Sequence, residues 1–261
     1  MSGVRTQRRS SALEVRLGYP ERLNAMDREA WVGLRRAIEQ AEEDDAVRAV
    51  VVRGDARAFC AGNDIGAMVA AHASGQAAAY FLDEMLPTFE AMALSPLPII
   101  SVVEGVALGG GVEILAFSDL VLAGTAASFG LPETRIGVWA TVFVGAADSW
   151  GGRRADARLG LTGERVDAVQ AQALGIVTHV CDADDVDPTL DRILDGICAG
   201  TPDATARTKR WLNRSLVTHG LTGARQALTQ LCEETLHQQE YEMAMARFEA
   251  GRAQRARGKD E

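Results

Sequence analysis

Short apolar runs rich in β-branched residues, each followed by glycine and then by helical sequence, constrain the fold of this chain most. Residues 47–52 form one such run before Gly54, and residues 99–103 form another before the glycines at 109–111. An apolar run of this length is typical of a strand that is buried on both faces of a sheet. Strand, turn and helix in succession predict an α/β fold with largely parallel strands.

The two ends of the chain differ from this pattern. Alternating apolar and polar residues at 13–17 predict a half-exposed first strand, and we expect residues 1–10 before it to be disordered. The later part of the sequence is mostly helical. No shift in composition marks a domain boundary, so we expect an α/β core over residues 11–195 and a helical C-terminal extension over 196–261.

Helical spacing is clearest after Asp27, a candidate N-cap, and in an alanine-rich stretch over about 76–94 that Pro87 should interrupt or kink. The apolar face expected for the first helix contains Trp31, Leu34, Ile38 and Ala41. In the extension, four late apolar positions are expected to need a partner surface in an oligomer: Leu221, Leu228, Leu231 and Leu236.

Composition excludes several classes of protein. The net charge of −9 argues against a general nucleic-acid binder, because phosphate contacts need a basic surface. Four scattered cysteines and four histidines make no metal-ligand spacing, so we expect reduced thiols and no metal. No run approaches the ~18 apolar residues of a membrane span, and the N-terminus lacks the apolar centre of a secretory signal. A cytoplasmic protein without membrane contact is therefore the expectation.

Two glutamates, Glu113 and Glu133, each follow a glycine-marked turn. Glu113 has apolar neighbours in sequence, which predicts a partly buried carboxylate that needs a partner or a function. Turns at residues 58–65 and 105–111 can offer free backbone N–H groups. Free N–H groups and carboxylates together can stabilise an enolate and move a proton beside it.

Simpler interpretations exist for each feature. Gly109, Gly110 and Gly111 could serve close helix–strand packing alone, although they fit neither common phosphate-binding glycine pattern. Glu113 could make a favourable contact with the helix dipole, and Glu133 could be a solvated loop acid.

Four segments, in order, resemble the signature segments of the crotonase superfamily, also called the enoyl-CoA hydratase/isomerase family. They are Tyr-Pro-Glu-Arg-Leu-Asn-Ala-Met (19–26), Ala-Phe-Cys-Ala-Gly-Asn-Asp-Ile (58–65), Gly-Val-Ala-Leu-Gly-Gly-Gly-Val-Glu (105–113) and Phe-Gly-Leu-Pro-Glu-Thr-Arg-Ile-Gly (129–137). Residues 161–177 resemble a fifth. The resemblance covers about 160 of the 261 residues.

The resemblance implies a spiral of β-β-α units whose C-terminal helices assemble a homotrimer, often a dimer of two trimers. It also implies an acyl-CoA thioester substrate whose carbonyl is polarised by two backbone N–H groups, which match Asn63 and Gly110 here. The positions implied to bind substrate and CoA are Arg22, Ala61, Asn63, Asp64, Ile65, Gly66 and Gly110.

Glu113 and Glu133 match the two acids of the hydratase branch. The resemblance implies that Glu133 delivers a proton to Cα and that Glu113 positions and activates water. The expected enzyme is thus an enoyl-CoA hydratase-like lyase of fatty acid metabolism, with no cofactor because acyl-CoA is the substrate. Alternatives are an enoyl-CoA isomerase, another acyl-CoA lyase of the same family, or a non-catalytic scaffold or RNA-binding module.

One stretch departs from the hydratase pattern. Hydratases of the common type usually follow the second glutamate with a Pro-Gly-x-Gly-Gly loop, whereas this chain has Gly-Val-Trp-Ala-Thr-Val-Phe-Val-Gly-Ala-Ala at 137–147. Trp139 and Phe143 place bulk where small residues are expected. They predict either a reshaped acyl pocket or, for Trp139, an ordinary core residue.

Overall fold

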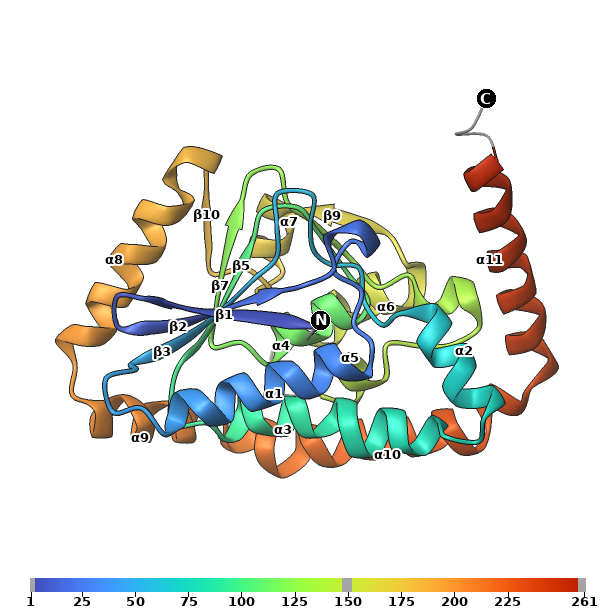
Figure 1. Ribbon diagram of the computed structural model, residues 1–261, viewed down its shortest axis with the longest axis horizontal. Helices are drawn as coiled ribbons and strands as arrows, with labels where there is room; N and C mark the ends of the chain where they lie inside the picture. Colours follow the sequence, from blue (N-terminus) through green and yellow to red (C-terminus); the bar gives the residue numbers. More distant parts are fainter. Residues whose placement is uncertain (1–2, 147–151, 258–261) are drawn as a thin grey trace.

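The computed structural model describes residues 3–146 and 152–257, except for the side chains of residue 249 and residues 252–257. Its strands form two sheets, and Figure 1 shows helices on both sides of the larger one. The strand order is β1-β2-β3-β5-β7-β10 in the six-stranded sheet and β4-β6-β8-β9 in the four-stranded sheet. The strands are β1 Val4–Arg9, β2 Ala12–Leu17, β3 Ala49–Arg53, β4 Ala58–Cys60, β5 Ile99–Val103, β6 Val106–Leu108, β7 Leu120–Gly124, β8 Ser128–Gly130, β9 Arg165–Asp167 and β10 His179–Cys181.

From β3 to β8, successive strands alternate between the two sheets, which produces the expected spiral of β-β-α units. Strands β3, β5 and β7 are parallel neighbours in the larger sheet, and β4, β6 and β8 are parallel neighbours in the smaller one. Only the pairs β1–β2 and β8–β9 are antiparallel among the described strands. The carboxyl ends of β4 and β6 therefore meet at one edge.

Helices are numbered in chain order. Figure 1 shows α1, α3 and α10 along one side of the molecule, α8 on another side, and α11 projecting away with the C-terminus. The α-helices are α1 Arg28–Glu42, α2 Ile65–Ala73, α3 Leu86–Leu94, α4 Gly110–Ala116, α5 Thr141–Gly145, α6 Arg153–Thr162, α7 Ala168–Ala173, α8 Val186–Ala199, α9 Pro202–Leu212, α10 Leu221–Glu233 and α11 Gln239–Arg257.

The larger sheet is buried on both faces. Val50 and Val52 of β3 belong to the main core with α1, whereas Ala49 and Val51 belong to a second, smaller core under α8. This alternation explains why the run of apolar residues is continuous in sequence. The N-cap and apolar face predicted for α1 are confirmed, because the Asp27 side chain accepts from Ala30 N at 3.0 Å and the face is buried.

The interruption expected at Pro87 is confirmed, because a π-helical segment at Ala79–Met85 precedes α3 and Pro87 lies in the first turn of α3. Two other expectations need correction. Residues 1–10 are not wholly disordered, because Val4–Arg9 forms β1. The late leucines do not require a partner chain, because Leu228, Leu231 and Leu236 are buried within the chain itself and Leu221 is half-buried.

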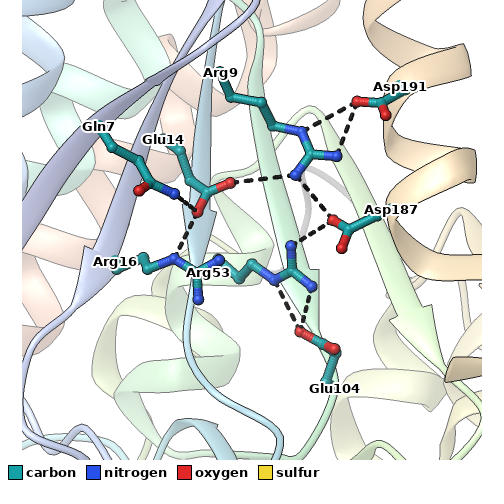
Figure 2. Close-up of polar contacts among 8 residues, drawn as sticks. All are labelled: Gln7, Arg9, Glu14, Arg16, Arg53, Glu104, Asp187 and Asp191. Carbon is teal, nitrogen blue, oxygen red and sulfur yellow. Dashed lines mark hydrogen bonds and ion pairs between the residues drawn. The ribbon is translucent and has the colours of Figure 1, made fainter. Parts of the chain in front are cut away.

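An ionic network fastens α8 to the N-terminal hairpin and the sheet (Figure 2). Glu14 of β2 is fully buried, and its carboxylate accepts hydrogen bonds from Gln7 and Arg16. The Arg53 guanidinium pairs with Glu104 at 2.8 Å and Asp187 at 2.7 Å. Arg9 pairs with two aspartates, Asp187 and Asp191, both at 2.9 Å. The network thus links three strands to the helix that covers the second core.

Candidate active site

Two backbone amides meet where β4 and β6 end side by side. A Cβ built on Gly62 would lie 3.1 Å from Gly110 N, and one built on Gly110 would lie 3.4 Å from Asn63 N. Neither Asn63 N nor Gly110 N donates a hydrogen bond to any residue in the described part of the chain. The two amides predicted to polarise a carbonyl are therefore brought together, and both are available to an acceptor.

Glycine is required at this meeting point. Gly62 and Gly109 have φ angles of +97° and +53°, a region that residues with a side chain rarely adopt. A Cβ on Gly109 would also lie 3.0 Å from Glu133 Oε1. The glycines therefore serve more than helix packing, because they let the two turns and an acid approach one another.

Glu113 lies in α4 and is 2% exposed. Its Oε1 accepts hydrogen bonds from Val142 N at 2.9 Å and from Phe143 N at 3.1 Å, both in α5. Burial raises the pKa of Glu113 from its ordinary 4.5 to about 7, although the two hydrogen bonds stabilise the anion and oppose the rise. Glu113 is thus a buried carboxylate held in one orientation by backbone donors.

Glu133 begins the 3₁₀ turn Glu133–Ile136 that follows β8. Its Oε2 is buried and has no hydrogen-bond partner among the described residues. Burial first, and then the charge of Glu113, raise the pKa of Glu133 from 4.5 to about 8. A Cβ built on Gly109 would lie 3.0 Å from Glu133 Oε1, and Glu113 N donates to Gly109 O at 3.0 Å, so both acids border the same glycine turn. Their joint catalytic role stays a prediction.

The side chain of Asn63 is held by two aromatic residues. Its Oδ1 lies 2.9 Å from Trp31 Nε1 and 3.2 Å from the Tyr80 hydroxyl. The single hydrogen of the Tyr80 hydroxyl has a closer acceptor in Met26 O at 2.9 Å, so Trp31 is the firmer donor to Asn63 Oδ1. Sequence reasoning missed Trp31 and Tyr80, because they lie 32 and 17 positions from Asn63 and only the fold brings them together.

Comparisons with known proteins identify the family. The family model described as enoyl-CoA hydratase/isomerase matches residues 7–255. The chain belongs to the enoyl-CoA hydratase/isomerase family. It is 31% identical to the 2,3-dehydroadipyl-CoA hydratase of Escherichia coli (strain K12) over 70% of this chain and 71% of that protein.

Solved structures of the enoyl-CoA hydratase/isomerase family share the whole architecture. An enoyl-CoA hydratase from Mycobacterium avium subsp. paratuberculosis K-10 has a TM-score of 0.81 at 26% identity, covering 95% of this chain and 96% of that one. A carnitinyl-CoA dehydratase from Mycobacterium avium 104 has a TM-score of 0.78 at 28% identity, covering 93% and 95%. The crotonase-type fold is therefore confirmed.

Arg22 contacts the segment that the resemblance predicts to bind CoA. Its guanidinium pairs with Asp64 at 2.7 Å and Asp27 at 3.0 Å, and it lies 4.0 Å from the centre of the Tyr19 ring. Asp64 also caps α2, where its side chain accepts from Ala67 N at 2.9 Å. Arg22 therefore supports the turn that carries Asn63, and its contact with CoA stays a prediction.

The other positions predicted to bind substrate lie on the same turn. Ala61 N donates to Leu23 O at 2.9 Å, which ties the turn to the first signature segment. Ile65 and Gly66 open α2, with Ile65 half-buried and Gly66 exposed. Their contact with CoA also stays a prediction.

The loop that departs from the usual hydratase sequence contributes through its backbone. Phe143 is fully buried in the main core, and its amide holds Glu113. Trp139 is half-buried and packs against the same core. Residue 147, the last of the unusual stretch, lies outside the described residues. No sequence pattern could reveal the donors at 142 and 143, because every non-proline residue carries the same amide.

Proposed function

We propose that this enzyme adds water across the 2,3 double bond of a 2-enoyl-CoA. The observation that carries the proposal is the pair of buried carboxyl groups, Glu113 and Glu133, beside two amides with no acceptor of their own. Enolate formation places negative charge on the thioester oxygen, where preorganised N–H donors are most effective. The two carboxyl groups can then handle the two proton transfers of hydration.

The environments of the two acids support distinct roles. Glu113 ionises more readily, because two backbone donors stabilise its anion, and it would accept a proton from water as the oxygen bonds to C3. Glu133 retains its proton to a higher pH and would donate it to C2. One proton leaves water and one reaches carbon, so the reaction balances with water and thioester alone and needs no cofactor.

The test is a series of 2-enoyl-CoA thioesters, from crotonyl-CoA to longer and branched chains, followed by loss of the conjugated enoyl absorbance. The expected product is the 3-hydroxyacyl-CoA. No loss with any member would contradict the hydratase proposal, and conversion of 3-enoyl-CoA instead would favour an isomerase. The series should be repeated on Trp139→Gly, because a pocket-lining indole would limit chain length whereas a core indole would leave the ratios of kcat/KM unchanged.

We also propose that the protein assembles as a homotrimer or a dimer of trimers, as the family resemblance implies, and that it acts in the cytoplasm. No helix in the described parts of the chain is both long and apolar enough to cross a membrane. Light scattering tests the assembly, since a single species at the 27.9 kDa chain mass would contradict it.

A further inference from the structure

The side-chain amide of Asn63 is fixed in one orientation. An indole N–H can only donate, so the Asn63 atom facing Trp31 Nε1 at 2.9 Å must be the oxygen. This contact decides between the two amide orientations that are otherwise hard to distinguish. The Asn63 Nδ2 group, with two hydrogens, is therefore turned away from Trp31.

Nδ2 borders the same space as the two backbone donors. A Cβ built on Gly110 would lie 3.4 Å from Asn63 N and 3.5 Å from Asn63 Nδ2, and Gly110 N is only two covalent bonds from that point. The three nitrogen donors thus lie close together around the Gly110 Cα, with Trp31 Cζ2 also 3.4 Å from the built Cβ. Nδ2 donates to no acceptor in the parts of the chain that the structure describes.

Asn63 Nδ2 is accessible to solvent, so water can accept its hydrogen bonds until a substrate oxygen replaces that water. The Trp31 and Tyr80 contacts hold the Asn63 oxygen, so no reorientation is needed when charge develops nearby. Such preorganisation is what makes a donor effective in a transition state.

We propose that Asn63 Nδ2 is a third donor to the thioester oxygen, beside the backbone N–H groups of Asn63 and Gly110. This inference rests on the proposed acyl-CoA function. Asn63 is then a catalytic residue through its side chain, and Trp31 is a positioning residue that fixes the amide. The Asn63 side chain thereby helps to stabilise the oxyanion, which two backbone amides would otherwise stabilise alone.

The experiment measures the carbonyl stretch of bound butanoyl-CoA, labelled with carbon-13 at the carbonyl, by infrared difference spectroscopy. This saturated thioester binds without being hydrated. Wild type should lower the stretch relative to free thioester, and Asn63→Leu, which keeps the volume but removes the donor, should lower it less. Asn63→Ala should resemble Asn63→Leu, and Trp31→Phe should fall between them and wild type, because the amide can then rotate.

Turnover of crotonyl-CoA gives the second readout. We expect kcat to fall about 10- to 100-fold in both Asn63 variants, at or below the ~10²–10³ typical of removing an oxyanion donor, since two donors remain. Thr88→Val is the matched control, because Thr88 Oγ1 bonds only to backbone oxygens, including Trp31 O at 2.9 Å. It should leave the carbonyl stretch at the wild-type value.

Each outcome decides one claim. A wild-type protein that binds butanoyl-CoA without lowering the stretch would contradict the proposed function itself. A lowered stretch that persists fully in Asn63→Leu would overturn only the third donor. If that variant instead changed the preference between acyl chains with and without an oxygen substituent, the amide would serve acyl recognition and the proposal would be wrong.

Discussion

At the scale of single residues, Glu113 and Glu133 differ because only Glu113 receives two backbone donors from another helix. Glu113 accepts two backbone hydrogen bonds, whereas Glu133 Oε2 is buried without one. Both carboxyl groups lose hydration, and each disfavours the charge of the other. Over a narrow range of pH, the two carboxyl groups therefore hold one proton between them.

This sharing predicts a bell-shaped pH dependence of kcat/KM. Burial raises the pKa of Glu113 to about 7 and that of Glu133 to about 8, so the pair holds one proton between these values. Activity should be greatest between about pH 7 and 8 and fall on both sides. Rates measured from pH 5 to 10 on one 2-enoyl-CoA check this, and a flat profile would contradict the two-carboxyl mechanism.

Glu133→Gln should lower activity and, at alkaline pH, raise stability. We expect kcat to fall by several orders of magnitude with little change in acyl-CoA affinity, because the amide keeps the shape but cannot exchange a proton. In wild type, the folded state keeps a proton that the unfolded state releases between about pH 4.5 and 8, so unfolding free energy falls as pH rises through that range.

The Glu133→Gln variant has no carboxyl group at this position, so its free energy of unfolding should not fall in this way as pH rises. Its free energy of unfolding at pH 8.5 should exceed that of wild type by roughly 3–5 kcal/mol, because each unit of the pKa rise from 4.5 to about 8 corresponds to about 1.4 kcal/mol, and the difference should vanish near pH 4. Urea titrations at both pH values measure it. A variant that is equally destabilised at both pH values would mean that Glu133 is held by contacts that the amide cannot make.

At the scale of elements, the sequence predicted what depends on local pattern. The apolar runs of β3 and β5 and the face of α1 follow from periodicity, and the glycines marked the turns of the site. Strand β1 could not be predicted, because Val-Arg-Thr-Gln-Arg-Arg is polar and its order comes from pairing with β2. The Asn63–Trp31 contact likewise depends on packing between distant segments.

Helix α5 connects the C-terminal helix α10 to Glu113 of the site. It supplies both amides that hold Glu113, and it packs on α10 at a glycine contact. A Cβ on Gly145 would lie 2.5 Å from Ala224 N, which real structures do not tolerate. We therefore expect Gly145→Ala to move α5 away from α10 and to loosen the hydrogen bonds to Glu113.

The expected result for Gly145→Ala is a loss of about 1–3 kcal/mol of stability from overpacking, with kcat lowered more than KM is changed. Weaker donors should also move the acidic limb of the pH profile to higher pH. Gly196→Ala is the matched control, since Gly196 is at an exposed position of α8 and a Cβ there meets nothing within 4 Å. If both variants behaved alike, α5 would not transmit the position of α10 to Glu113.

At the scale of the whole molecule, the central sheet separates two apolar cores of unequal size. The smaller one, under α8, contains nine fully or nearly fully buried residues. Ionic contacts of Arg9 and Arg53 with α8 supplement it on the same face of the sheet (Figure 2). Arg53 is nearly buried, so removing its guanidinium should cost more free energy of unfolding than breaking an ion pair at the surface.

Arg53→Ala should therefore lower the free energy of unfolding by about 3 kcal/mol, because Glu104 and Asp187 lose their shared cation. Arg8→Ala is the matched control: Arg8 pairs with Asp44 in an exposed position, and its loss should change stability by less than about 1 kcal/mol. Thermal and urea unfolding of both variants measure the difference. Since no partner of Arg53 belongs to the site, kcat/KM below the transition should stay at the wild-type value. A loss of activity without a loss of stability would show instead that α8 and the sheet beneath it set the geometry of Glu113 and Glu133.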